Sequence, residues 1–109
     1  MGNESWQVFD LGQLQKQLTN APVQYKEFLN VPALSCGLYR LGVGARDMQS
    51  PHDEDEIYFV LSGRAKMKLG ETERLVGPGN LLYVGATETH SFFEILEEMT
   101  LLVFFATSK

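Results

Sequence analysis

The chain contains few of the residues that most directly suggest chemistry. It has one cysteine, Cys36, which excludes an internal disulfide and fits a reducing compartment. Cys36 lies in an apolar run, so we interpret it as a small buried side chain rather than a catalytic thiol, which would need an activating base nearby. Only two histidines are present, His52 and His90. Any histidine chemistry must therefore depend on these two positions.

Basic residues are also scarce, and long apolar runs are absent. Nine Lys and Arg against 14 Asp and Glu give a formal net charge of −5, and binding to nucleic acid would need clustered Lys and Arg. Arg64, Lys66 and Lys68 alternate along one expected strand, which predicts a solvated face, with an anion site as the alternative. No stretch approaches the ~20 apolar residues that span a membrane, and no signal peptide is visible. We expect a cytoplasmic protein with neither a nucleic-acid nor a membrane partner.

The remaining pattern predicts an all-β fold with one short N-terminal helix. Asp10 can cap a helix in which Leu11, Leu14 and Leu18 recur at helical spacing, before Asn20 and Pro22 end it. Many short strands separated by Gly and Pro are typical of a sandwich or barrel. We expect a single domain over 1–109, with 1–22 as an N-terminal extension and 23–106 as a β-barrel. Strands are expected at 23–29, 34–41, 57–61, 65–69, 74–76, 81–84, 90–96 and 100–106.

The most informative segment runs from Pro51 to Gly63. His52 and Glu56 are four residues apart at the start of an apolar strand, so in an extended conformation their side chains share a face. The neighbouring carboxylates, including Asp55, are expected to be solvated. His90 opens another apolar strand downstream. Imidazoles with a carboxylate suit Fe, Zn, Mn, Ni or Cu better than Ca or Mg, although a histidine on a strand is often only a hydrogen-bonded structural residue.

Two motifs connect these residues to a known family. The first places glycine, histidine, glutamate and glycine at Gly44, His52, Glu56 and Gly63, and the second places glycine and histidine at Gly79 and His90. On these residues the chain resembles the cupin superfamily, and its sequence over 47–56 resembles that of small, mostly uncharacterised single-domain bacterial cupins. The resemblance implies a double-stranded β-helix (jelly-roll) barrel. It also implies one divalent transition metal (Fe, Zn, Mn or Ni) and a homodimer.

The departures from the family pattern bear on the metal site. Ser50 stands where the first histidine of the motif is expected, and Glu94 stands where the second motif closes with asparagine. Gly85, Ala86 and Thr87 replace its Pro-x-Gly. The resemblance therefore implies a ligand set reduced to three residues, with Gln49 as an outside candidate for a fourth. The three implied ligands are His52, Glu56 and His90.

Alternate residues of a strand share a face, so the strands that carry these ligands also predict which residues form a pocket wall beside them. Tyr58 shares a face with Glu56 and is a candidate proton donor. The candidate pocket residues are Met48, Val60 and Phe92. They suit a small, partly apolar or planar molecule, or else they simply fill the barrel.

The leading functional hypothesis is a mononuclear transition-metal cupin that acts on a small organic molecule. Two histidines and one carboxylate favour oxygenase-like chemistry. A metal-dependent isomerase or lyase, and a non-catalytic cupin that binds or senses a small ligand, are the alternatives. The outward apolar face at Ile57, Phe59 and Leu61, together with the run 101–105, predicts a homodimer.

Overall fold

The computed structural model describes residues 6–45, 54–86 and 88–106, and it confirms the all-β expectation. Within these residues one short helix precedes the strands. In chain order the elements are α1 (Leu11–Lys16), β1 (Val23–Val31), β2 (Leu34–Leu41), β3 (Glu56–Leu69), β4 (Thr72–Val76), β5 (Leu81–Val84) and β6 (His90–Ala106).

Helix α1 begins where the sequence predicts. The side chain of Asp10 accepts a hydrogen bond from the backbone N–H of Gln13 at 3.0 Å, which satisfies one of the donors that a helix start leaves unpaired. Leu14 is the buried residue of the helix. The rings of Phe9 and Phe28 lie 4.9 Å apart and tie the segment before the helix to β1. No helix in the described part of the chain is long and apolar enough to cross a membrane.

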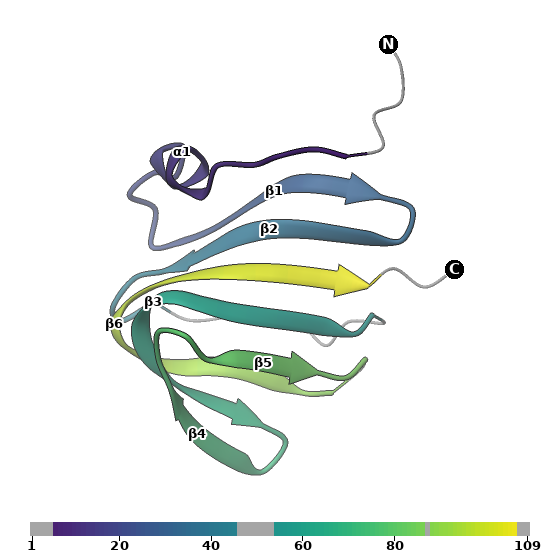
Figure 1. Ribbon diagram of the computed structural model, residues 1–109. Coiled ribbons are helices and arrows are strands. Elements are labelled where there is room, and N and C mark those ends of the chain that lie inside the picture. The colour runs from purple at the N-terminus through teal and green to yellow at the C-terminus, as the bar shows by residue number, and fades with distance from the viewer. Residues whose placement is uncertain (1–5, 46–53, 87, 107–109) are drawn as a thin grey trace.

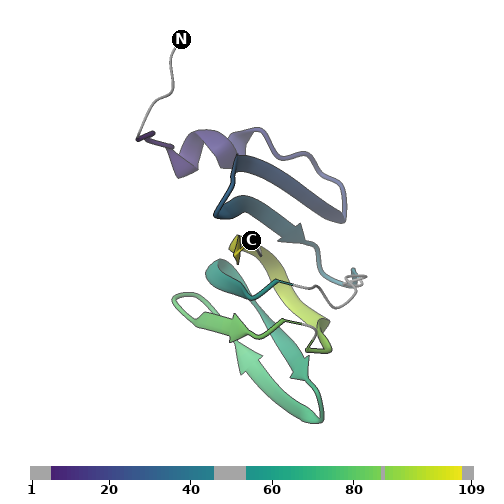
Figure 2. The same ribbon diagram turned by 90° about the vertical axis from the view of Figure 1, so that its right-hand side faces the viewer.

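The strands form one antiparallel sheet that folds over on itself. Its order is β1-β2-β6-β3-β4, and β5 also pairs with β3. The first half of β3 pairs with β5 and its second half pairs with β4, while β6 runs along both halves. Figures 1 and 2 show β3 and β6 bending together, so that β4 lies in one layer and β1 and β2 in the other. This arrangement is consistent with the expected jelly roll.

The expectation of separate strands at 57–61 and 65–69, and again at 90–96 and 100–106, is wrong. Each pair is one continuous strand, β3 and β6, that bends without breaking. The bend in β3 lies at Gly63, whose φ of +91° favours glycine, and the pairing with β6 is irregular between Val60 and Ala65. A Cβ on Gly63 would overlap the carbonyl oxygen of Glu98. Gly63, which lies between the two expected strands, is a bulge inside one continuous strand.

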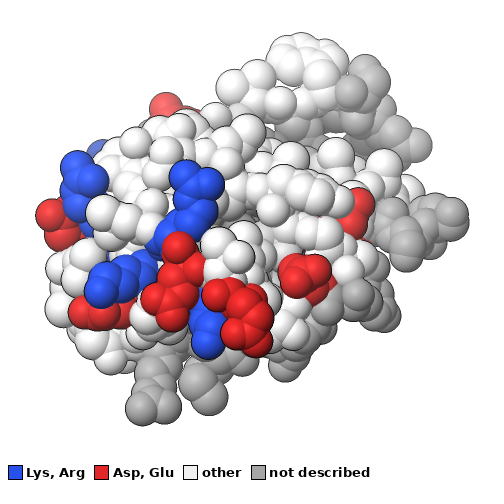
Figure 3. All heavy atoms as spheres, turned by 90° about the horizontal axis from the view of Figure 1, so that it is seen from below, with Lys and Arg blue, Asp and Glu red and all other residues white. Residues whose placement is uncertain are grey.

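The core lies between the two layers and is built from the inward side chains of the strands. Tyr58 and Val60 on the first half of β3 and Met67 on its second half are all buried. The outward positions on the second half carry charge: Lys66 lies 3.4 Å from Glu94, and Arg64 lies 3.9 Å from Glu97. Figure 3 shows basic and acidic side chains interspersed on this side. Arg64, Lys66 and Lys68 therefore lie on an outer face of mixed charge.

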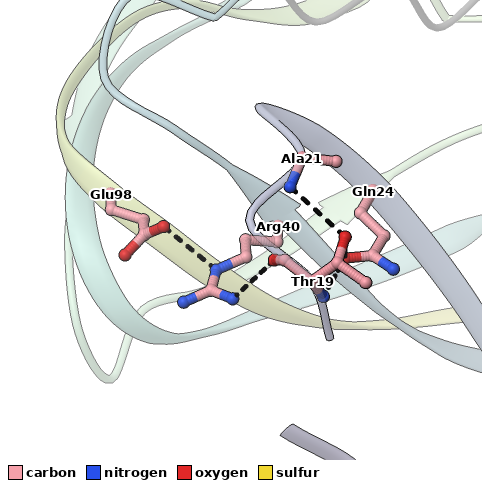
Figure 4. Close-up of polar contacts among 5 residues, drawn as sticks. All are labelled: Thr19, Ala21, Gln24, Arg40 and Glu98. Carbon is pink, nitrogen blue, oxygen red and sulfur yellow. Dashed lines mark hydrogen bonds and ion pairs between the residues drawn. The ribbon is translucent and has the colours of Figure 1, made fainter. Parts of the chain in front are cut away.

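Arg40 on β2 fixes the connection that follows α1. One guanidinium nitrogen donates to the backbone carbonyl of Thr19 at 3.1 Å, and Nε lies 3.1 Å from a carboxylate oxygen of Glu98 on β6 (Figure 4). The backbone N–H of Thr19 also donates to the side chain of Gln24 at 2.7 Å. These contacts hold the 17–22 connection against β1, β2 and β6.

The C-terminal apolar run contributes less surface than the sequence suggests. Leu101 and Val103 from the C-terminal run have no exposed area, because they face the core. Ile57 on the outer face is 37% exposed. The expected homodimer stays a prediction, and its apolar surface is smaller than the run 101–105 implied.

Candidate metal centre

The fold brings Glu56 and His90 into contact. Each begins a strand, Glu56 at the start of β3 and His90 at the start of β6. Glu56 pairs with Phe105 in the first half of β3, whereas His90 pairs with Leu69 at the far end of that strand, so the two residues belong to opposite sides of the bend. The Oε1 atom of Glu56 lies 2.9 Å from the Nε2 atom of His90, and both side chains are about 99% buried. The bend of the sheet thus delivers a carboxylate and an imidazole to one interior point.

The hydrogen bond made by Nδ1 of His90 determines whether Nε2 carries a proton in the neutral ring. Nδ1 lies 2.9 Å from the backbone carbonyl oxygen of Glu88, which accepts only, so Nδ1 carries a proton and donates it. In a neutral ring, Nε2 is then an acceptor, which has the Tyr58 hydroxyl at 3.1 Å and a Glu56 carboxylate oxygen at 2.9 Å. Metal-binding histidines commonly hold their second N–H on a backbone carbonyl in this way.

The Glu56 carboxylate provides the test of whether a cation suits this position. A lone pair and a carboxylate oxygen at 2.9 Å repel each other unless a proton or a metal ion lies between them. A proton on Nε2 would satisfy Oε1 alone, and Oε2 is buried without a hydrogen-bond partner among the described residues. An unsatisfied buried acceptor costs about 1–3 kcal/mol. The donor set present, one imidazole and one carboxylate, fits a transition metal.

Tyr58 completes the described part of the site. Its hydroxyl lies 3.1 Å from Nε2 of His90, and its ring packs edge-on against Phe92 with centroids 5.2 Å apart. Tyr58, Val60 and Phe92 have no exposed area and belong to the hydrophobic core. The proposed roles of Val60 and Phe92 as pocket residues stay predictions.

Several expected site residues lie outside the described residues. These are Met48, Gln49, Ser50 and His52. Within 6–45, 54–86 and 88–106, no group of three His, Cys, Asp or Glu side chains is arranged to hold a metal ion. The third ligand expected from the sequence, His52, and the fourth candidate, Gln49, therefore stay predictions.

Asp55 is a residue whose role sequence reasoning missed. It is exposed, as expected, yet its Oδ1 accepts a hydrogen bond from the backbone N–H of Ala86 at 2.8 Å. The hydroxyl of Tyr83 also hydrogen-bonds to Asp55, and the negative charge of Asp55 raises the pKa of that phenol. Asp55 thus anchors the connection between β5 and β6 that carries Glu88, the residue whose carbonyl holds His90. A run of four carboxylates gives no sequence signal for such a contact.

Tyr25 on β1 is the second residue that was missed. Its ring lies over Gly37 on β2, where a Cβ would come within 2.7 Å of a ring carbon. Burial, together with the negative charges of Glu27, Cys36 and Glu56, raises the pKa of Tyr25 to about 12. The ring therefore lies within electrostatic range of Glu56. A glycine inside an apolar strand often marks such a close approach, so Gly37 was the available signal.

A cavity of about 280 Å³ is lined by strand neighbours of the site residues. Of the residues in its wall, Met67 pairs with Phe92, Leu69 pairs with His90, and Leu82 pairs with Tyr58. Glu56 and His90 themselves are not part of the wall. The remaining wall comes from β4, through Thr72, Arg74 and Val76.

Comparison with known proteins assigns the class to which this fold and site belong. The family model of the cupin domain matches residues 37–105, which run from within β2 to within β6 and include both Glu56 and His90. The chain belongs to the cupin family.

Individual relatives agree with this assignment. An uncharacterized protein of Streptomyces coelicolor is 38% identical over 99 residues, which cover 91% of this chain and 94% of the relative. The cupin domain of Cnp3 from Schizosaccharomyces pombe is similar in structure, with a TM-score of 0.75 and 13% identity over 86% of this chain and 72% of that one. The DMSP lyase DddQ from Ruegeria pomeroyi has a TM-score of 0.74 and 19% identity, over 84% of this chain and 52% of the lyase. At these identities the two structures show the fold alone.

Proposed function

We propose that this protein is a mononuclear transition-metal cupin that acts on a small organic molecule. The observation that carries the proposal is the buried contact between Glu56 Oε1 and His90 Nε2, with Nδ1 of His90 held by a backbone carbonyl and Oε2 of Glu56 left without a partner. His52 is the expected third ligand. Two histidines and one carboxylate with open positions favour oxygenase-like chemistry, which the metal would supply by binding and polarising its ligands.

The chain's own residues support this role in three ways. Glu88 fixes the orientation of the His90 ring through its carbonyl. Tyr58 and Phe92 exclude water from the inner side of the site, since neither has exposed area. Glu56 and His90 come from the two sides of the bend, so the geometry of the site depends on the folded barrel.

Metal analysis tests the proposal. Purified wild-type protein should contain near-stoichiometric transition metal, and His90→Ala and Glu56→Gln should both lose it. Glu94→Gln removes the same charge from the exposed outer face, where Glu94 pairs with Lys66, and should keep the metal. Circular dichroism establishes that each variant is folded. Equal trace metal in all four proteins would refute the proposal.

A metal-dependent isomerase or lyase is the second candidate, because Tyr58 places a hydroxyl 3.1 Å from His90 Nε2. Such a group can deliver or remove a proton beside a bound substrate. Oxygen uptake by the Fe²⁺-loaded protein with a substrate would favour the oxygenase. Turnover without oxygen uptake, abolished in Tyr58→Phe while the metal content is unchanged, would favour proton transfer.

A further inference from the structure

Arg74 occupies an unusual position for an arginine in this fold. On β4, Thr72, Arg74 and Val76 pair with Leu69, Met67 and Ala65 of β3, and directly opposed residues share a face of the sheet. Ala65, Met67 and Val76 are buried in the core. Arg74 therefore stands in the inward register, between apolar residues, with its side chain exposed at the edge strand.

The charge of Arg74 is not neutralised by the described residues. Arg40, Arg64 and Lys66 each lie beside a glutamate, and none of the ion pairs in the described part of the chain includes Arg74. A guanidinium is always charged at physiological pH and carries five donors in a planar fork. Those donors are available to a ligand.

Arg74 lines two adjoining cavities between β3, β4 and β5. The first, of about 280 Å³, is lined by Arg74 together with Met67, Leu69, Thr72, Val76 and Leu82. A second cavity, also about 280 Å³, shares Leu69, Arg74, Val76 and Leu82 with the first and extends to the exposed side of β5. Arg74 is the charged residue common to both.

We infer that this cavity binds a small organic carboxylate, with its apolar body among Met67, Leu69, Val76 and Leu82 and its carboxylate on Arg74. A planar guanidinium matches a carboxylate in a bidentate pair, whereas a dianionic phosphate would need more donors than Arg74 and Thr72 offer. The volume lies just under the range of about 300–1,000 Å³ typical of small-molecule pockets, so the ligand is about the size of a single ring. This inference goes beyond the proposed function, since neither the cavity nor Arg74 depends on a metal ion.

Binding of matched probes to ¹⁵N-labelled protein tests the inference. Benzoate has the required shape and charge, benzamide has the same shape without the charge, and phenyl phosphate carries a different anion. Benzoate should shift the amide signals of Met67, Val76 and Leu82, and benzamide should bind more weakly. Arg74→Gln should weaken benzoate binding about tenfold or more, since it removes a charge-assisted contact. Lys66→Gln removes one positive charge from the outer face of β3 and should leave benzoate affinity unchanged.

Four results would overturn the inference: no benzoate binding to the wild type, equal affinity in Arg74→Gln, an equal loss in Lys66→Gln, or tighter binding of phenyl phosphate than of benzoate. A parallel Co²⁺ titration followed by absorbance separates this inference from the proposed function. Arg74-dependent benzoate binding in a protein that does not bind Co²⁺ would refute the metal site and leave the carboxylate site standing. Co²⁺ binding without benzoate binding would do the reverse.

Discussion

Substitution of Gly63 by alanine tests the bend on which the site depends. Gly63 has a φ of +91°, where an L-residue costs about 1–2 kcal/mol. The new Cβ would also overlap the carbonyl oxygen of Glu98 and lie 2.6 Å from the Cα atom of Met99. Both atoms belong to the backbone of β6, which is paired on both sides and cannot swing away. Forcing extra volume into packed structure adds about 1–3 kcal/mol, so we expect a total loss of about 2–5 kcal/mol.

Gly79→Ala is the matched control. Gly79 has nearly the same backbone conformation, with φ of +87°, but a Cβ there meets nothing within 4 Å. It should therefore cost only the conformational term of about 1–2 kcal/mol. The difference between the two variants isolates the steric clash between β3 and β6.

Urea denaturation followed by circular dichroism measures both losses. Since a domain of this size is typically stable by about 5–15 kcal/mol, Gly79→Ala should remain folded and Gly63→Ala should unfold at clearly lower urea. If the two variants lost the same free energy of unfolding, the argument that Gly63 is required by contact with β6 would be wrong.

Three further outcomes are expected. Burial raises the pKa of the Cys36 thiol to about 11 from 9, so Ellman's reagent at pH 8 should label the folded protein about 100-fold more slowly than the urea-unfolded chain; equal rates would contradict a buried thiol. Asp55→Ala should weaken Co²⁺ binding about tenfold by releasing the connection that carries Glu88, and Asp55→Asn, which keeps an acceptor, should restore most of it; unchanged affinity in Asp55→Ala would refute this role. The pKa values of Tyr25 and Cys36 are both higher in the folded state, which holds more protons between pH 9 and 12, so the stability that these two groups contribute should be constant below pH 9 and fall as pH rises through that window; a melting temperature that stays flat from pH 9 to pH 12 would contradict it.

The local sequence was sufficient to predict which segments form the helix and the strands, but not to predict the bend in β3. The Asp10 cap and the strand 34–41 follow from nearest-neighbour chemistry, and both are observed as expected. The expected strands 57–61 and 65–69 leave Gly63 between them, because glycine usually interrupts a strand. Its function as a bulge depends on Glu98 and Met99, which are distant in the sequence. No local pattern distinguishes a glycine that ends a strand from one that bends it.

The candidate site also contains residues that the sequence predicts and residues that it does not. Glu56 and His90 were found because histidines are scarce in this chain and because the cupin motifs name their positions. Arg74 and Asp55 were missed, since their roles come from cross-strand register and from a contact to Ala86. Such relations appear only when distant strands are paired.

The position of β6 in the sheet has a consequence for how the chain folds. The β1–β2 and β3–β4 pairs are hairpins of neighbouring strands, but among the described residues β2 and β3 are joined to each other through β6, which follows both hairpins in the sequence. Leu34 pairs with Ala106, so this step closes a long stretch of chain and should be slow. During synthesis the two hairpins must wait with unpaired edges until β6 leaves the ribosome. His90 arrives on that same strand, so the pair that it forms with Glu56 is assembled in the step that completes the barrel.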